Sequence, residues 1–166
     1  NSSSEIKTSK GGENFITTLK TEWFLHISEG IKGGKELSEK GINPKQWIIT
    51  EVPNTVLSSL TSAGVYKDIY RSMNMNNIPT EQFKSSWVYY KSFSWNKEKG
   101  ENVILDLDGI NYRANIWLNG TKIADTSTVF GVYKQYEFDI TELLNDDNKL
   151  VIEVYPPIPG DFTIGF

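Results

Sequence analysis

The most constraining feature of the sequence is a pair of alternating stretches, at 103–108 and 112–118, followed directly by Asn119-Gly120. In both stretches every second side chain is apolar, and a period of two places those side chains on one face of a β-strand. Asn-Gly adopts the two left-handed backbone conformations that a tight hairpin turn needs. The chain is therefore predicted to build antiparallel strands with one buried face.

Other segments of the chain are also typical of strands, because they alternate in the same way or are rich in aromatic and β-branched residues. These segments are Trp23–Ile27, Trp87–Phe93, 133–140 and 149–155. Many short strands separated by turns, with almost no helix, predict an all-β fold, an antiparallel jelly-roll β-sandwich. Its expected core consists of Val103, Leu105, Leu107, Ala114, Ile116, Leu118, Phe138, Ile140, Leu150, Ile152 and Val154.

The remaining segments are predicted to be irregular or only briefly helical. Residues 1–13 are polar and contain Gly and Ser, so we expect a flexible leader there, and the sandwich domain is assigned to 14–166. Residues 29–46 have little apolar content and are predicted to form a long surface loop. Short helical turns are expected at Thr55–Ser62 and around 141–144.

Composition excludes several classes of function. The 166 residues include no Cys and a single His, His26, which excludes thiolate chemistry and zinc–thiolate sites; we expect no metal and no cofactor. The net charge of -4 is spread along the chain without a basic stripe, so no nucleic-acid partner is expected. No apolar run approaches the ~18 residues that a membrane span requires, so no membrane partner is expected either.

Polar residues on the strands have plain structural interpretations beside the functional ones. Asp106 and Asp108 project from one face of a single strand, whereas a catalytic carboxylate pair faces across a cleft, so a solvated outer face is the favoured interpretation. Arg113, Asn115 and Trp117 share the face opposite the core and could bind a sugar, although packing is favoured for the aromatic ring. His26 is expected to be structural. Asn119-Gly120-Thr121 matches a glycosylation sequon, but its hairpin role explains it better.

Five segments between Trp47 and Phe166 resemble motifs of glycoside hydrolase family 2, in the order in which that family has them. The segments are EVPNTVL at 51–57, DIY at 68–70 with MNMNNIP at 73–79, DGINYRANIWLNG at 108–120, FDIT at 138–141 and PIPGDFTIG at 157–165. One departure is Asn54, where the family usually has Gly. The subgroup that the chain most resembles contains exo-β-glucosaminidases, endo-β-mannosidases and β-mannosidases.

The resemblance implies the N-terminal sugar-binding jelly roll of a retaining β-glycosidase, similar to galactose-binding domains. Family members draw two catalytic glutamates from a TIM barrel that follows two β-sandwich domains, and 166 residues leave no room for such a barrel. We therefore expect no catalytic residue here. The expected partners are the missing sandwich and barrel domains and the terminal sugar of a β-glycoside. The end at Gly165-Phe166 resembles an interruption of the domain.

Two functions remain open at this point. The chain is either an accessory domain that braces the barrel and lines one rim of its pocket, or a free-standing carbohydrate-binding module. The bare label of a sugar-binding domain does not separate them, because fold does not imply function. The polar start at Asn1–Ser4 is typical of a processed chain and favours a periplasmic or secreted protein.

The resemblance also suggests which residues contact sugar, because family members send an Asn and an Asp from loops of this domain to the pocket. Asp161, after Gly160, is assigned to hydrogen bonds with sugar hydroxyls, and so are Asn74 and Asn76 in the loop before the strand at Ser85. The alternative is that Asp161 caps its own turn and the asparagines hold their loop together. For Asp161, contact with the sugar is the favoured interpretation. For Asn74 and Asn76, sugar contact and a structural role in the loop are equally favoured.

Overall fold

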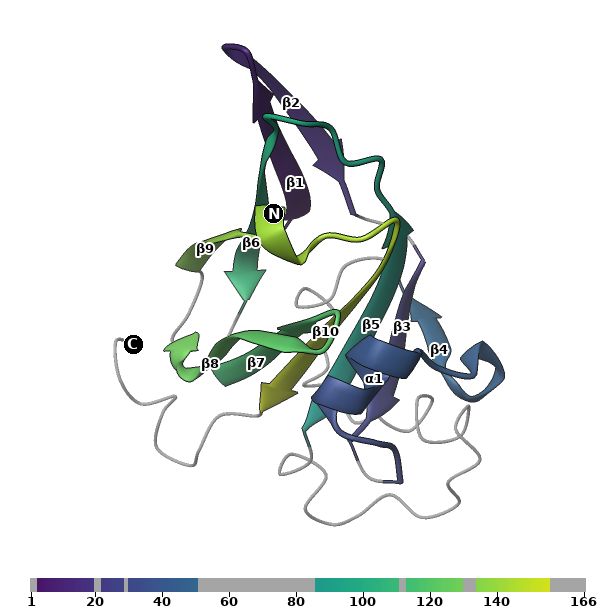
Figure 1. Ribbon diagram of the computed structural model, residues 1–166. Coiled ribbons are helices and arrows are strands. Elements are labelled where there is room, and N and C mark those ends of the chain that lie inside the picture. The colour runs from purple at the N-terminus through teal and green to yellow at the C-terminus, as the bar shows by residue number, and fades with distance from the viewer. Residues whose placement is uncertain are drawn as a thin grey trace, which may run out of the picture.

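The computed structural model describes residues 3–19, 22–28, 30–50, 86–110, 113–129 and 134–155, which form two antiparallel sheets packed face to face (Figure 1). The four-stranded sheet contains, in spatial order, β2 (Glu13–Thr18), β1 (Ser3–Lys10), β6 (Asn102–Ile110) and β9 (Lys134–Asp139). The six-stranded sheet contains β4 (Ile48–Thr50), β3 (Trp23–Ile27), β5 (Trp87–Ser94), β10 (Asp147–Tyr155), β7 (Arg113–Leu118) and β8 (Thr121–Val129). The all-β antiparallel sandwich predicted from the sequence is confirmed.

The core between the two sheets is built by the alternating side chains. Ten of the eleven predicted core residues are buried, with exposures of 0–2%, and Phe138 packs partly buried against them. Full burial of an aliphatic side chain stabilises the fold by about 1.5–3 kcal/mol, and a slip of one residue would expose the whole set. The register of the sandwich is therefore fixed by its hydrophobic pattern.

Helix α1 (Gly34–Lys40) and the 3-10 turn η1 (Pro44–Gln46) replace the surface loop predicted for 29–46. The helix packs Leu37 onto the outer face of the six-stranded sheet, in a second apolar cluster with Trp47, Val88, Tyr90 and Val151. Lys–Glu pairs four residues apart lie on its exposed face and at its start, where Lys32 precedes the helix, and such pairs stabilise helices by a few tenths of a kcal/mol each. These pairs are Lys32–Glu36 at 3.1 Å, Lys35–Glu39 at 3.8 Å and Glu36–Lys40 at 3.3 Å.

The close approach of α1 to the sheet depends on Gly34, and this predicts a measurable effect of one methyl group. A β carbon at Gly34 would collide with the Trp117 ring and the Glu153 carboxylate. We expect Gly34→Ala to destabilise the fold by about 1–3 kcal/mol, as overpacking does, measured by thermal denaturation. Gly33→Ala is the control, because a β carbon at Gly33 meets no atom within 4 Å. Equal stability of the two variants would contradict the described seat of α1.

Strand β1 lies where the sequence predicts a flexible leader over residues 1–13, and β2 begins at the last residue of that range. β1 pairs with β6 from Ser3 to Ser9, and it directs Ile6 and Thr8, exposed by 0% and 6%, into the sandwich. Ile6 is the one fully apolar residue among these two, and a single such residue is too weak a signal to predict a β-strand from composition. The hydrogen-bond ladder to β6 stabilises this strand where hydrophobic content alone would not.

The turn between β7 and β8 has the conformation that Asn119-Gly120 predicts, with φ of 51° at Asn119 and 87° at Gly120. The Asn119 amide donates to the Leu143 carbonyl and to Oδ1 of Asn148, both at 2.9 Å, and its Oδ1 accepts from the Lys149 backbone N–H at 2.9 Å. Both amide hydrogens are thus in use inside the fold. This supports the hairpin interpretation of the sequon over the glycosylation one.

Candidate functional site

The three residues predicted to contact sugar, Asp161, Asn74 and Asn76, lie outside the described residues. The structure does describe the strands to which their segments are joined. Residues 51–85 lead to β5, which begins at Trp87, and β10 ends at Tyr155 immediately before residue 156. β5 and β10 are neighbours, and Trp87 lies opposite Val154. The end of segment 51–85 and the start of segment 156–166 therefore join adjacent strands at the same end of the six-stranded sheet (Figure 1), whereas segment 51–85 begins after Thr50 of β4, which lies opposite Trp23.

This end of the six-stranded sheet, called the loop end, is marked by Ile27, Trp87, Arg113 and Tyr155. Ile27 pairs with Trp87, which lies opposite Val154, and the next residue, Tyr155, pairs with Arg113, so the four residues lie within one residue of a common row across β3, β5, β10 and β7. The Ser28 backbone N–H donates to the Ser86 carbonyl at 3.0 Å, and the two seryl hydroxyls are hydrogen-bonded as well. The ends of β3 and β5 are thereby held together where the chain leaves the sheet.

Half-buried polar side chains line the outer face of the loop end. Arg113 and Asn115 come from β7, and Glu153 and Tyr155 come from β10. The Asn115 amide donates to the Tyr155 hydroxyl at 3.2 Å. Burial, together with the nearby charge of Glu153, raises the pKa of Tyr155 despite that bond, so its phenol stays neutral. A guanidinium, an amide and a neutral phenol can hydrogen-bond sugar hydroxyls, but they are not an acid–base pair.

Tyr155 and its pairing with Asn115 were missed by the sequence reasoning. The available signal was weak: Tyr155 is the last residue of an alternating run and falls on the outer face, beside the face that Arg113 and Asn115 share. The register between β7 and β10, which brings these residues together, is a long-range property. It cannot be read from either strand alone.

Trp117, also on this face, packs against protein. Its Nε1 donates to Glu153 at 2.8 Å, Gly34 of α1 lies against its ring, and the Lys122 Nζ is 5.5 Å from the ring centroid. The packing role favoured from the sequence is therefore the one observed. His26 is likewise structural: its ring lies 5.3 Å from that of Trp47, and its Nδ1 is 2.6 Å from the Ile27 carbonyl oxygen.

Asp106 corrects the sequence interpretation of a solvated outer face. It is only 3% exposed, and its carboxylate lies 3.1 Å from the Nζ of Lys7 on the neighbouring strand. The hydrogen bond and charge of Asp106 raise the pKa of Lys7. An unpaired buried charge is unfavourable, and the lysine head covers this one. The lysine contact indicates a structural ion pair.

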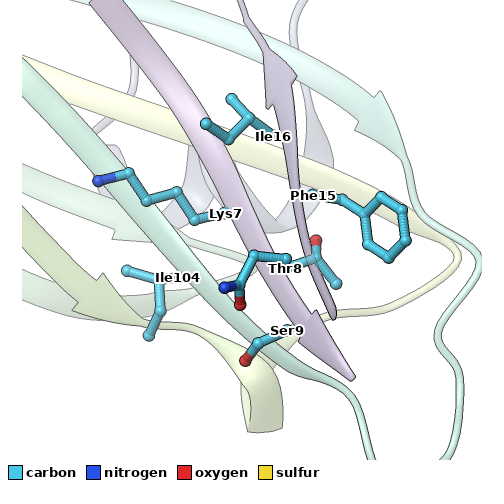
Figure 2. Close-up of a pocket in the computed structure, with 7 residues that line it drawn as sticks. Lys7, Thr8, Ser9, Phe15, Ile16 and Ile104 are labelled. Carbon is cyan, nitrogen blue, oxygen red and sulfur yellow. The ribbon is translucent and has the colours of Figure 1, made fainter. Parts of the chain in front are cut away.

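A shallow hollow of about 310 Å³ lies on the four-stranded sheet, between β2, β1 and β6 (Figure 2). Lys7, Asn14, Ile16 and Ile104 are among its lining residues. The strands around it belong to the four-stranded sheet, whereas the loop end belongs to the six-stranded sheet. The hollow is lined by the polar residues Lys7, Thr8, Ser9 and Asn14 together with Phe15, Ile16 and Ile104, and it is open and shallow, which is unlike the enclosed apolar cleft of the usual small-molecule site.

Neither a metal centre nor a membrane span is found among the residues that the structure describes. No three side chains of the His, Cys, Asp and Glu types gather there as metal ligands would. No helix in the described ranges has both the length and the apolar character needed to cross a membrane.

The chain is similar to domains of known glycoside hydrolases. A family model described as "Glycosyl hydrolase 2 galactose-binding domain-like" matches residues 34–161. An exo-β-D-glucosaminidase of Hypocrea virens is 33% identical over 96% of this chain, and a mannosylglycoprotein endo-β-mannosidase of Lilium longiflorum is 30% identical over 67% of it. The chain spans only 18% and 12% of these relatives.

A similar domain occurs in a solved structure, the exo-chitosanase CsxA of Amycolatopsis orientalis. It superposes with a TM-score of 0.67 and 28% identity, over 86% of this chain and 17% of that one. A β-glucuronidase of Bifidobacterium dentium, 20% identical with a TM-score of 0.56 over 93% of this chain and 21% of that one, shares the fold. The sandwich described above is therefore a known architecture, found within much longer chains.

Proposed function

The chain belongs to the galactose-binding-like domains of glycoside hydrolase family 2, and we propose that it acts as a non-catalytic part of a retaining β-glycosidase. In this proposal the domain braces the catalytic barrel and lines one rim of its sugar pocket. The substrate is a β-glycoside with a terminal glucosamine or mannose, since the relatives are named for exo-β-glucosaminidase and mannosidase activities. Catalytic groups come from the barrel, and no residue of this chain is assigned to bond cleavage.

One observation carries the proposal of a pocket rim. Two segments contain the assigned residues, and the end of 51–85 and the start of 156–166 join adjacent strands at the loop end of the six-stranded sheet. Loops that leave one end of a rigid sandwich are where binding groups usually lie. The neutral phenol of Tyr155 and the Asn115 amide add hydrogen-bonding groups beside them. Asp161 is assigned to a sugar hydroxyl, with Asn74 and Asn76 as further contacts.

The test of this rim is Asp161→Ala in a full-length polypeptide that contains this domain. Loss of a charged hydrogen bond to a buried hydroxyl costs about 1.5–3 kcal/mol, so kcat/KM on the best substrate should fall at least about tenfold. Asp147→Ala is the matched control, because Asp147 is exposed and pairs with Ser94 at the opposite end of β5. An unchanged kcat/KM in a folded Asp161 variant would remove that residue from the rim.

The isolated chain tests the non-catalytic part of the proposal. It is expected to hydrolyse no chromogenic β-mannoside, β-glucosaminide or β-galactoside, because retaining hydrolysis needs two carboxyl groups ~5–5.5 Å apart and the family draws both from the barrel. Turnover that disappears on mutating a residue of this chain would overturn the proposal. Calorimetric titration with glucosamine and mannose oligomers should show little heat; tight binding would instead favour a free-standing module.

A further inference from the structure

Three half-buried polar side chains lie together on the outer face of the six-stranded sheet at the loop end, and we call them the polar cluster: Arg113, Asn115 and Tyr155. Tyr155 lies directly opposite Arg113, and Asn115 is two residues further along β7, so all three share one face. The Asn115 amide donates to the Tyr155 hydroxyl at 3.2 Å. The cluster therefore joins two neighbouring strands, β7 and β10, through one side-chain hydrogen bond.

Much of the hydrogen-bonding capacity of the polar cluster is unused within the described ranges. The bond from Asn115 occupies the oxygen of Tyr155 as an acceptor and leaves the phenolic O–H to donate. In that part of the chain this O–H has no acceptor, Oδ1 of Asn115 has no donor, and the Arg113 guanidinium has no carboxylate partner. Partly desolvated groups without a protein partner are places where a polar ligand gains hydrogen bonds.

Helix α1 leaves the polar cluster uncovered. Its first residue, Gly34, lies against the side chains of Trp117 and Glu153. One turn later the Ser38 hydroxyl accepts from the Gly120 N–H at 2.9 Å, at the turn between β7 and β8. The helix therefore extends along the face away from the loop end, and the polar cluster lies beyond its first residue.

The composition of the polar cluster indicates the kind of ligand that it fits. Arg113 and Tyr155 supply donors and Asn115 supplies an acceptor, while sugar hydroxyls both donate and accept and can reproduce the bonds of water that they displace. The carboxylate of Glu153, which accepts from Nε1 of Trp117 at 2.8 Å, lies directly opposite Asn115. Its negative charge offsets that of the guanidinium, which disfavours an anionic ligand. A ligand rich in hydroxyl groups is therefore the best match.

We propose that the polar cluster binds hydroxyl groups of the second sugar unit of a β-linked oligosaccharide, the unit next to the terminal one. This inference rests on the proposed function, in which residues of the segments 51–85 and 156–166 contact the terminal unit. Tyr155 is the last residue of β10, so the cluster lies on the sheet at the base of the second of these segments. Contacts from the sheet and contacts from the segments then serve neighbouring units of one substrate.

Substrates with and without a second sugar unit test this assignment. The full-length polypeptide is assayed with the 4-nitrophenyl glycoside and with the β-linked trisaccharide of the same sugar, mannose or glucosamine, whichever it cleaves faster. Tyr155→Phe removes one hydroxyl and should lower the ratio of kcat/KM, trisaccharide over 4-nitrophenyl glycoside, about three- to tenfold. Arg113→Met removes a charged donor and should lower this ratio at least about tenfold.

Tyr90→Phe is the matched control, because Tyr90 lies on the outer face of the neighbouring strand β5 but is buried beside Leu37 of α1. It should leave kcat/KM on both substrates unchanged. Asp161→Ala should lower both values together and keep their ratio, so failure of the proposed rim is seen separately from failure of the second-unit contact. An unchanged ratio in folded Tyr155 and Arg113 variants would overturn the proposal, whether their kcat/KM values fall equally or not at all.

Discussion

Asn119→Ala is expected to lower the free energy of unfolding by about 4 kcal/mol, although only one half-buried turn residue is altered. The substitution removes three hydrogen bonds at once, to Leu143, Asn148 and Lys149. Each intramolecular bond contributes about 1 kcal/mol, and more where it leaves a buried partner unsatisfied. Asn148 is 1% exposed but is not left unsatisfied, because its Oδ1 also accepts from the Asn145 backbone N–H at 2.8 Å. Alanine at φ of 51° adds backbone strain of about 1 kcal/mol.

Two further variants separate the hydrogen bonds from the backbone conformation. Asn119→Gly keeps the left-handed conformation available and loses the bonds, so its effect should be about 1 kcal/mol smaller than that of alanine. Asn119→Asp keeps an acceptor for the Lys149 N–H but loses both donations. Urea denaturation of the three variants gives the comparison. Nearly equal stability of Asn119→Gly and the unmodified chain would contradict the hydrogen-bonded role.

The strands of the sandwich could be predicted from the sequence because each carries its own signal. The period-two pattern of β6, β7 and β10 and the Asn-Gly turn are local, and burial of one face enforces them. β1 and α1 were missed for the opposite reason. Ile6 and Leu37 are their main apolar anchors, and the stability of both elements comes from sheets assembled elsewhere in the chain.

The candidate site, too, could be predicted from the sequence only in part. The motif resemblance assigned Asp161, Asn74 and Asn76, and these assignments stay predictions. The shared end of β5 and β10 follows from strand order in the six-stranded sheet, which no local pattern encodes. The burial of Asp106 has a similar origin, because it depends on Lys7 of a strand nearly a hundred residues earlier in the sequence. Pairing between distant strands is thus the information that sequence patterns lack.

Trp87→Ala is expected to have the largest effect on stability, about 3–5 kcal/mol, because truncation of a buried tryptophan leaves a large cavity. Trp87 is 2% exposed and begins β5 at the loop end, opposite Val154 of β10 and Ile27 of β3. Phe93 lies on the same face of β5 near its other end and is only half-buried. Phe93→Ala should therefore destabilise the fold less in the same urea titration.

The position of the Trp87 cavity also predicts where the structure loosens. The Ser28 N–H bonds to Ser86 at the loop end, while the Trp95 N–H bonds to Asp146 at the opposite end of the sheet. Hydrogen exchange of both amides should accelerate in Trp87→Ala, and that of Ser28 more than that of Trp95, because local opening adds to global unfolding. Equal acceleration of the two would mean that the variant only lowers global stability. A larger change at Ser28 would make Trp87 the anchor that holds the loop end, and with it the sugar-contact segments, on the sheet.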